Sequence, residues 1–164
     1  MNSILIGAVA SLIAGLATGA GALPVLLTRK VSDRTLDIML GFSAGVMLAA
    51  TSFSLIIPAM ERGGLLVSIV GLMLGALVIH VIDRFVPHMH FISGAEGPPS
   101  SRLARIWLFI IAITIHNFPE GLAVGVSFGT GDISSGIVVA MAIGLQNMPE
   151  GLAVAMPLVR EKYS

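Results

Sequence analysis

Five long stretches with almost no charged residues constrain this chain more than any other feature. The helices that they predict span residues 3–28, 38–60, 63–83, 106–128 and 133–159. Each is long enough to cross the hydrocarbon core of a bilayer, which takes about 20 helical residues. Strands of a membrane barrel would alternate polar and apolar residues, and these stretches do not. Only 11% of the 164 residues are charged and 55% are hydrophobic, so we expect an all-α integral membrane protein with five transmembrane helices in one domain.

Lysine and arginine predict how these helices are oriented. If the N-terminus lies outside and five helices cross the membrane, eight of the nine basic residues fall on the inside. Basic residues concentrate in the cytoplasmic loops of membrane proteins, so this orientation is the expected one. The residues on the inside are then Arg29, Lys30, Arg34, Arg84, Arg102, Arg105, Arg160 and Lys162, with Arg62 outside.

Residues 84–105 form the longest predicted connection and divide the helices three plus two. Its central sequence, "SGAEGPPSSR", is rich in Gly, Pro and Ser, which is typical of a flexible linker, and the orientation places it in the cytoplasm. The chain has no cysteine, and therefore no disulfide and no thiolate metal site. Its net charge is zero, and no basic tract indicates a nucleic-acid partner.

A short polar motif occurs twice inside the last two apolar stretches. "HNFPEG" covers residues 116–121 and "QNMPEG" covers residues 146–151. The longer segments "NFPEGLAV" and "NMPEGLAV" differ at one position in eight and lie 30 residues apart. That offset corresponds to one helix and a short turn, so two neighbouring helices carry the motif. We interpret the two copies as two halves of one site.

Helical spacing brings polar side chains to the glutamate of each motif. Residues three and four apart share a helix face. Pro119 and Pro149 cannot donate backbone hydrogen bonds, so each helix should kink there. Broken helices at membrane depth are tolerated where they line a cavity, and transporters use them to coordinate ions. The neighbours one turn before Glu120 and Glu150 are His116 and Asn117 in the first copy, and Gln146 and Asn147 in the second.

Two carboxylates at the middle of a membrane need compensation. Ionisable residues there indicate a functional site, and the predicted helices hold no Lys or Arg to pair with Glu120 and Glu150. The compensating charge is then a proton or a bound cation. His, Glu, Asn and Gln donors suit Zn²⁺ or another first-row divalent metal. The donor set alone does not choose among Zn²⁺, Fe²⁺, Mn²⁺ and the heavier Cd²⁺. The alternative is that the prolines are plain kinks and the glutamates are protonated; duplication on adjacent helices favours the metal.

The paired motifs resemble those of the ZIP (Zrt-, Irt-like protein) family of divalent-metal transporters. "HNFPEG" followed by "QNMPEG" is similar to the family's fourth and fifth transmembrane helices, and "GLAVGVSFG" and "GLAVAMPL" resemble its bacterial, GufA-like branch. The resemblance implies a transporter rather than an enzyme, with Zn²⁺ as its substrate and no organic cofactor. It also implies a multi-pass protein of the plasma membrane, in bacteria the inner membrane, that moves metal toward the cytoplasm.

The resemblance further implies two adjacent metal positions that share both glutamates. The first comprises His116, Glu120, Gln146 and Glu150, and the second comprises Asn117, Glu120, Asn147 and Glu150. Some family members have an acidic residue at the place of Asn147, so asparagine weakens the second position here. In "AGVMLAATSFS", which resembles the family's pore-lining stretch, Met47 is a candidate soft ligand. The alternative for Met47 is gap filling, a common role of methionine.

A second candidate site lies at the inner end of the third predicted helix, in "HVIDRFVPHMH". Two histidines with a nearby carboxylate can hold a divalent ion, and the resemblance implies a metal exit or relay site formed by Asp83, His88 and His90. The alternative is that these are ordinary solvated residues. His80 has no firm role.

The family has eight transmembrane helices, whereas five are predicted here. The three absent helices include a sixth that supplies another carboxylate, so we expect them as a partner, from the same gene or from a separate chain. A homodimer is a further candidate assembly. Two other functions stay open: a proton-coupled or metal-binding membrane protein that does not transport, and an intramembrane hydrolase using His116 and Glu120. A zinc protease would need two histidines four residues apart, which these helices lack.

Overall fold

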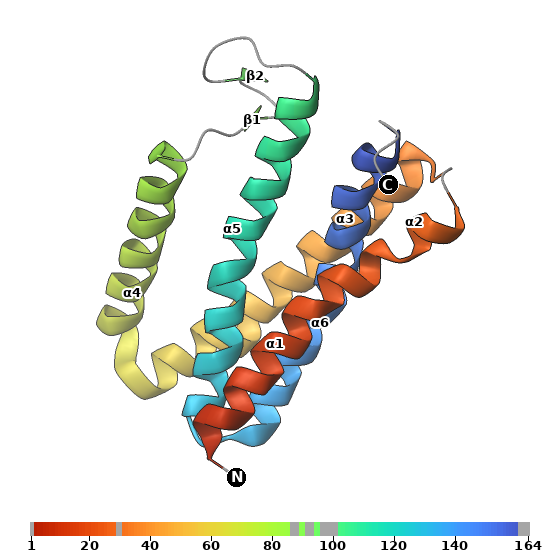
Figure 1. Cartoon of the computed structure of the whole chain (residues 1–164). Helices are drawn as coiled ribbons and strands as arrows, with labels where there is room; N and C mark the ends of the chain where they lie inside the picture. The colour runs from red at the N-terminus through yellow and green to blue at the C-terminus, as the bar shows by residue number, and fades with distance from the viewer. Residues whose placement is uncertain (1, 29–30, 86–88, 91–93, 96–101, 161–164) are drawn as a thin grey trace.

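The computed structural model describes residues 2–28, 31–85, 89–90, 94–95 and 102–160, nearly all of them helical (Figure 1). The prediction of an all-α protein is confirmed for these residues, apart from one short antiparallel pair of strands. The elements are α1 (Ser3–Ala22), α2 (Pro24–Leu27), α3 (Asp33–Ala49), the π-helix η1 (Ala50–Ile56), α4 (Ile57–Phe85), β1 (Met89–His90), β2 (Gly94–Ala95), α5 (Arg102–Gly129) and α6 (Ile133–Arg160).

Side-chain caps fix where three of the helices begin. Asn2 accepts a bond of 3.2 Å from the backbone at the start of α1, and Ser32 accepts one of 3.1 Å from Thr35 at the start of α3. Asp132 caps α6 in the same way, since it accepts from the hydroxyl of Ser135 at 2.6 Å and from its backbone N–H at 3.2 Å. These two bonds hold the pKa of the Asp132 carboxyl below its usual range, and the bond from the Ser135 hydroxyl has the larger effect.

Within the part of the chain that the structure describes, four helical segments are long and apolar enough to cross a membrane by length and composition. They are Ser3–Leu27, Asp33–Ile82, Ile106–Gly129 and Ile133–Val159. The second has 50 residues and covers two of the five predicted helices, apart from the last residue of 63–83. The structure therefore supports a membrane protein with several apolar helices, whereas five separate crossings and an outside N-terminus stay predictions.

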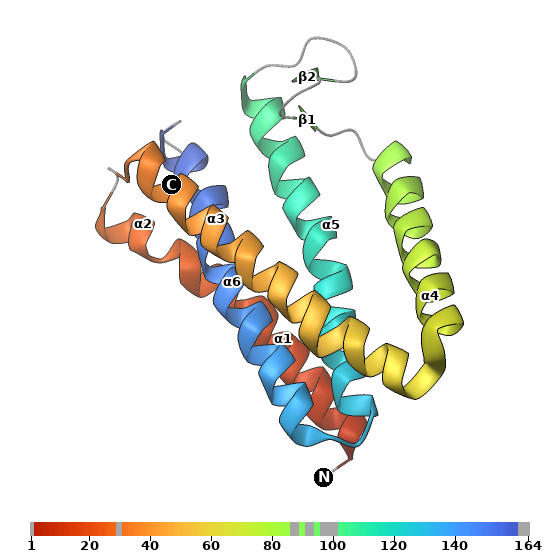
Figure 2. The ribbon, with the colours of Figure 1, turned by 180° about the vertical axis from the view of Figure 1, so that it is seen from behind.

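A bend near Gly64 divides this 50-residue segment. Gly64 has φ 77° and ψ 168°, a conformation that glycine adopts at little cost. After it the chain turns back, and the rest of α4 stands apart from the other helices in both views (Figures 1 and 2). The sequence suggested a turn at Glu61 and Arg62, but both are helical. Glu and Arg are good helix formers and glycine is a poor one, so the break falls on the glycine.

Helix α1 packs most extensively on α6, and α5 packs against both. Two glycines permit this close approach, as small residues do between membrane helices. A Cβ on Gly151 would collide with the carbonyl oxygen of Thr18, and a Cβ on Gly21 would collide with that of Met148. Helix α3 lies on another side of α6 (Figure 2). Helix α6 is therefore the central helix, touched by α1, α3 and α5.

Two apolar clusters bracket the polar motif of α6. The first cluster contains Val139 and Ile143, which precede the motif on α6. They pack with Ala14 of α1 and with Val124 and Phe128 of α5. The other contains Leu152 and Met156, after the motif, with Val25 of α2. Residues 146–150 lie between these clusters along the helix, so polar side chains are enclosed above and below by apolar packing.

Candidate metal centre

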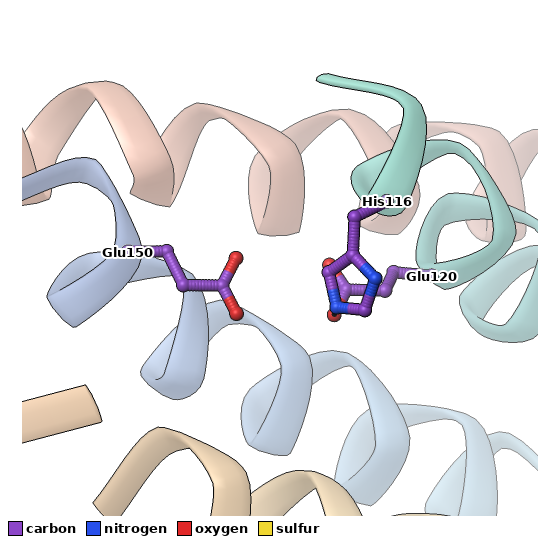
Figure 3. A group of neighbouring side chains, drawn as sticks. All are labelled: His116, Glu120 and Glu150. Carbon is purple, nitrogen blue, oxygen red and sulfur yellow. Dashed lines mark ion pairs between the residues drawn. The ribbon is translucent and has the colours of Figure 1, made fainter. Parts of the chain in front are cut away.

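The two motifs meet where α5 and α6 pack together. His116 and Glu120 come from α5 and Glu150 comes from α6 (Figure 3). One ligand atom from each of the three lies within 4.8 Å of the other two. Glu120 and Glu150 are 8% and 5% exposed, whereas the His116 side chain is 46% exposed. The cluster thus has two buried carboxylates and one imidazole at its open side.

The spacing of these atoms suits a small cation. Zinc ligands lie about 2.0–2.2 Å from the metal in tetrahedral sites, which places neighbouring ligand atoms roughly 3.3–3.6 Å apart. His116 Nε2 and Glu120 Oε1 are 3.5 Å apart. Side chains one turn apart on a helix therefore already have the separation that two ligands of one ion require.

Gln146 of α6 contacts Glu120 of α5 and is fully buried. Its amide nitrogen donates to Glu120 Oε1 and, at 3.0 Å, to Asn147 Oδ1. The structure therefore brings together the four residues expected at the first metal position, His116, Glu120, Gln146 and Glu150. The amide nitrogen faces Glu120, so Gln146 must turn its amide for the oxygen to serve as a ligand.

Helix α1 holds the amide groups of the two asparagines. Asn117 Nδ2 donates to Thr18 Oγ1 at 3.1 Å, and Asn147 Nδ2 donates to the carbonyl oxygen of Ala14 at 2.9 Å. Ala14 and Thr18 are one turn apart on α1, so a single face of that helix fixes both amides. Because the amide nitrogens of Asn117 and Asn147 bond to α1, their amide oxygens face away from the α1 atoms that accept these bonds.

Three buried oxygens at this site have no hydrogen-bond partner among the residues that the structure describes. They are Asn117 Oδ1, Glu120 Oε2 and Glu150 Oε2. A buried acceptor without a partner costs about 1–3 kcal/mol, and more when it is charged. Residues 106–128 and 133–159 contain no Lys or Arg that could supply a donor. A bound cation would supply a partner for oxygens of this kind, and protons on the two carboxyl groups are the alternative that the sequence left open.

A cavity of about 370 Å³ opens beside the cluster. Its wall includes His116, Glu120, Gln146 and the half-buried Met47, which is therefore close to the site without being shown as a ligand. The rest of that wall includes part of η1, and single π-helical turns frequently occur at functional sites. The η1 residues that line the cavity are Ala50, Thr51 and Leu55.

The second predicted site, at the inner end of α4, falls where the structure does not describe the side chains. Asp83 lies near the end of α4 and His90 lies in β1, while His88 is outside the described residues. A metal exit site there stays a prediction. His80 lies on α4 and is exposed.

Sequence reasoning missed two hydroxyl residues at the centre, Thr18 and Ser43. Ser43 lies on α3, is 2% exposed, and donates to Gln146 and Glu150 across the helix interface. A signal was available for Ser43, because it precedes Met47 by four residues and so shares its helix face. Thr18 gave no such signal, since it lies among many small residues of α1.

Comparisons with known proteins identify the family to which the matched sequence is similar. The family model of the ZIP Zinc transporter matches residues 90–164, which contain both motifs. Zinc transporter ZIPB of Bordetella bronchiseptica is 46% identical over 139 residues, covering 74% of this chain and 42% of the relative. Zinc transporter GufA of Myxococcus xanthus is 46% identical over 144 residues, covering 82% of this chain and 57% of the relative.

A more distant relative is zinc transporter ZupT of Chlorobaculum parvum, which is 36% identical over 140 residues, covering 74% of this chain and 52% of the relative. The chain spans about half the length of the curated relatives that it matches. The region matched by the family model, residues 90–164, contains the paired motifs and the four side chains brought together at the interface of α5 and α6. The chain therefore belongs to the ZIP family, as a GufA-like member.

Proposed function

We propose that this chain forms the metal-binding part of a membrane transporter that moves divalent metal, with Zn²⁺ as the principal substrate, toward the cytoplasm. The observation that carries the proposal is the meeting of His116, Glu120 and Glu150 within 4.8 Å, from two helices. The relatives named above are zinc transporters, which supports zinc over the other divalent ions.

In this proposal the metal exchanges its water shell for the side chains of the two motifs. The buried oxygens of Asn117, Glu120 and Glu150 that have no described partner supply ligands. Two carboxylates balance the charge of one divalent ion, so the occupied site is nearly neutral in an apolar surrounding. The glutamates are shared by two neighbouring ion positions, with His116 and Gln146 completing one and the two asparagines completing the other.

Alternating access requires the site to move relative to part of the protein. We propose that α1, α5 and α6 move together, because the contacts at Gly21 and Gly151 join α1 to α6 backbone to backbone. Helices α3 and α4 belong to the other part, together with the remaining helices of the family fold. The proposed topology has five crossings and an outside N-terminus, and metal leaves toward Asp83 and His90 on the inside.

The test is uptake of radioactive ⁶⁵Zn²⁺ by proteoliposomes. The vesicles contain this chain together with a chain that supplies the remaining family helices. We expect uptake that Glu120→Gln abolishes, because Glu120 belongs to both ion positions. The matched control is Glu61→Gln, an exposed glutamate outside the motifs, which should leave uptake unchanged.

The same assay separates transport from binding alone. Saturable Zn²⁺ binding without uptake would indicate the alternative, a membrane metal-binding protein. Equal uptake by the parent and Glu120→Gln would contradict the proposed site.

A further inference from the structure

Ser43 joins α3 to the motif of α6. It lies near the middle of α3 and is 2% exposed. Its hydroxyl oxygen is 3.0 Å from the backbone oxygen of Gln146, 3.5 Å from Gln146 Oε1 and 3.3 Å from Glu150 Oε1. A single hydroxyl from a helix without a motif thus reaches two of the residues proposed to bind metal.

Three other hydroxyls in these apolar helices bond within their own helix, whereas that of Ser11 on α1 donates to the carbonyl oxygen of Gly121 on α5 at 2.6 Å. Ser68 donates to the carbonyl of Gly64, Thr114 to that of Ile110, and Ser127 to that of Val124. This local bond is the usual arrangement for Ser and Thr inside a helix. Ser43 donates across the interface from α3 to α6. Its position is therefore not explained by a hydrogen bond to an acceptor in its own helix.

The hydroxyl has one proton for three acceptors. It can rotate among them, and the backbone oxygen of Gln146 is the nearest. Donation to Glu150 engages Oε1, whereas Oε2 of the same carboxylate is buried and has no partner among the described residues. A hydroxyl bound to Oε1 therefore limits rotation of the Glu150 carboxylate, which points toward His116 and Glu120 (Figure 3).

We infer that Ser43 is a positioning residue of the metal centre, which fixes the Glu150 carboxylate and the backbone of Gln146 for cation binding. This inference rests on the proposed function. Groups that orient metal ligands typically contribute 10- to 100-fold to metal affinity. The bonds from Ser43 to Glu150 and Gln146 Oε1 are long, so we expect about a tenfold effect, at the low end of that range.

Four variants of the full chain in detergent test this role: Ser43→Ala, Ser43→Thr, Ser43→Val and Ser127→Ala. Thr and Val have the same shape and differ only in the hydroxyl, so their comparison isolates the hydrogen bond from packing. Ser127 is also buried, but its hydroxyl bonds only within its own helix, and it serves as the control. Zn²⁺ affinity is measured by calorimetry, and the ligand field is measured from the absorption spectrum of bound Co²⁺.

We expect Ser43→Ala to bind Zn²⁺ about tenfold more weakly than the parent, and Ser43→Val about tenfold more weakly than Ser43→Thr. The Co²⁺ spectrum should change in Ser43→Ala, while Ser127→Ala should match the parent in both measurements. Equal affinities for Ser43→Thr and Ser43→Val, or an unchanged Co²⁺ spectrum in Ser43→Ala, would overturn the inference alone. Failure of the parent to bind Zn²⁺ would overturn the proposed function as well.

Discussion

The two motif glycines, Gly121 and Gly151, have the same sequence context and opposite surroundings. Both follow a Pro-Glu pair. A Cβ at Gly151 would collide with the carbonyl oxygen of Thr18 and lie 3.2 Å from the nitrogen of Ala22, whereas a Cβ at Gly121 has no neighbour within 4 Å. We therefore predict that Gly151→Ala is destabilising and that Gly121→Ala is tolerated.

The size of the difference follows from the atoms in contact. Overpacking costs about 1–3 kcal/mol, and a collision with backbone cannot be relieved by rotating a side chain, so we expect about 2–3 kcal/mol at Gly151. Replacing glycine by alanine inside a helix gains up to about 1 kcal/mol from propensity at either site. The gain cancels when the two variants are compared, which leaves Gly151→Ala less stable than Gly121→Ala by about 2–3 kcal/mol.

The assay is reversible unfolding in mixed micelles, followed by circular dichroism, with the free energy of unfolding obtained for the parent and both variants. Each variant is the control for the other, because both add one methyl group to the same local sequence. Equal free energies of unfolding for Gly121→Ala and Gly151→Ala would show that α1 does not pack on α6 as described, and the reasoning would fail.

Three further predictions concern other parts of the molecule. Bonds from Ser135 lower the pKa of Asp132 from its ordinary value of 3.8. Ionised Asp132 therefore stabilises the fold above that value, and this contribution is lost as the pH falls through the lower folded-state value. The free energy of unfolding, measured from pH 5 to 2, should depend less on pH in Asp132→Asn than in the parent. Cysteines at Ser134 and Gly94 should differ in cells, with only Ser134→Cys reacting with an impermeant thiol reagent; labelling of Gly94→Cys from outside would contradict the proposed topology. Thr18→Val removes the acceptor of the Asn117 amide. One hydrogen bond has a net value of about 0.5–1.5 kcal/mol, so calorimetry should show roughly a 2- to 12-fold loss of Zn²⁺ affinity. Unchanged affinity would mean that Asn117 is not a ligand.

The residues of the candidate site were predictable because the motif is local and repeated. Spacing alone placed His116 beside Glu120, and duplication on neighbouring helices predicted that Glu150 would join them. The apolar stretches likewise predicted the helices, since length and composition decide which segments can cross a membrane.

What the sequence did not predict depends on how the helices rotate and pack against each other. The contributions of Thr18 and Ser43 require knowing which faces of α1 and α3 meet α5 and α6. The π-helix η1 has no composition that distinguishes it from an α-helix. The turn at Gly64 was missed because nearby charges suggested a loop at Glu61 and Arg62, whereas the backbone places its break at the residue that tolerates a positive φ.

The central claim is that the two motifs form one metal site, and Zn²⁺ binding by single and double variants tests it most directly. Calorimetry of the parent, Glu120→Gln, Glu150→Gln and the double variant gives the coupling between the glutamates, because residues that share one ion are not additive. We predict that each single variant loses most of the affinity and that the double variant loses little more. Losses that add in full, or a Glu120→Gln variant that binds Zn²⁺ as tightly as the parent, would contradict a shared site.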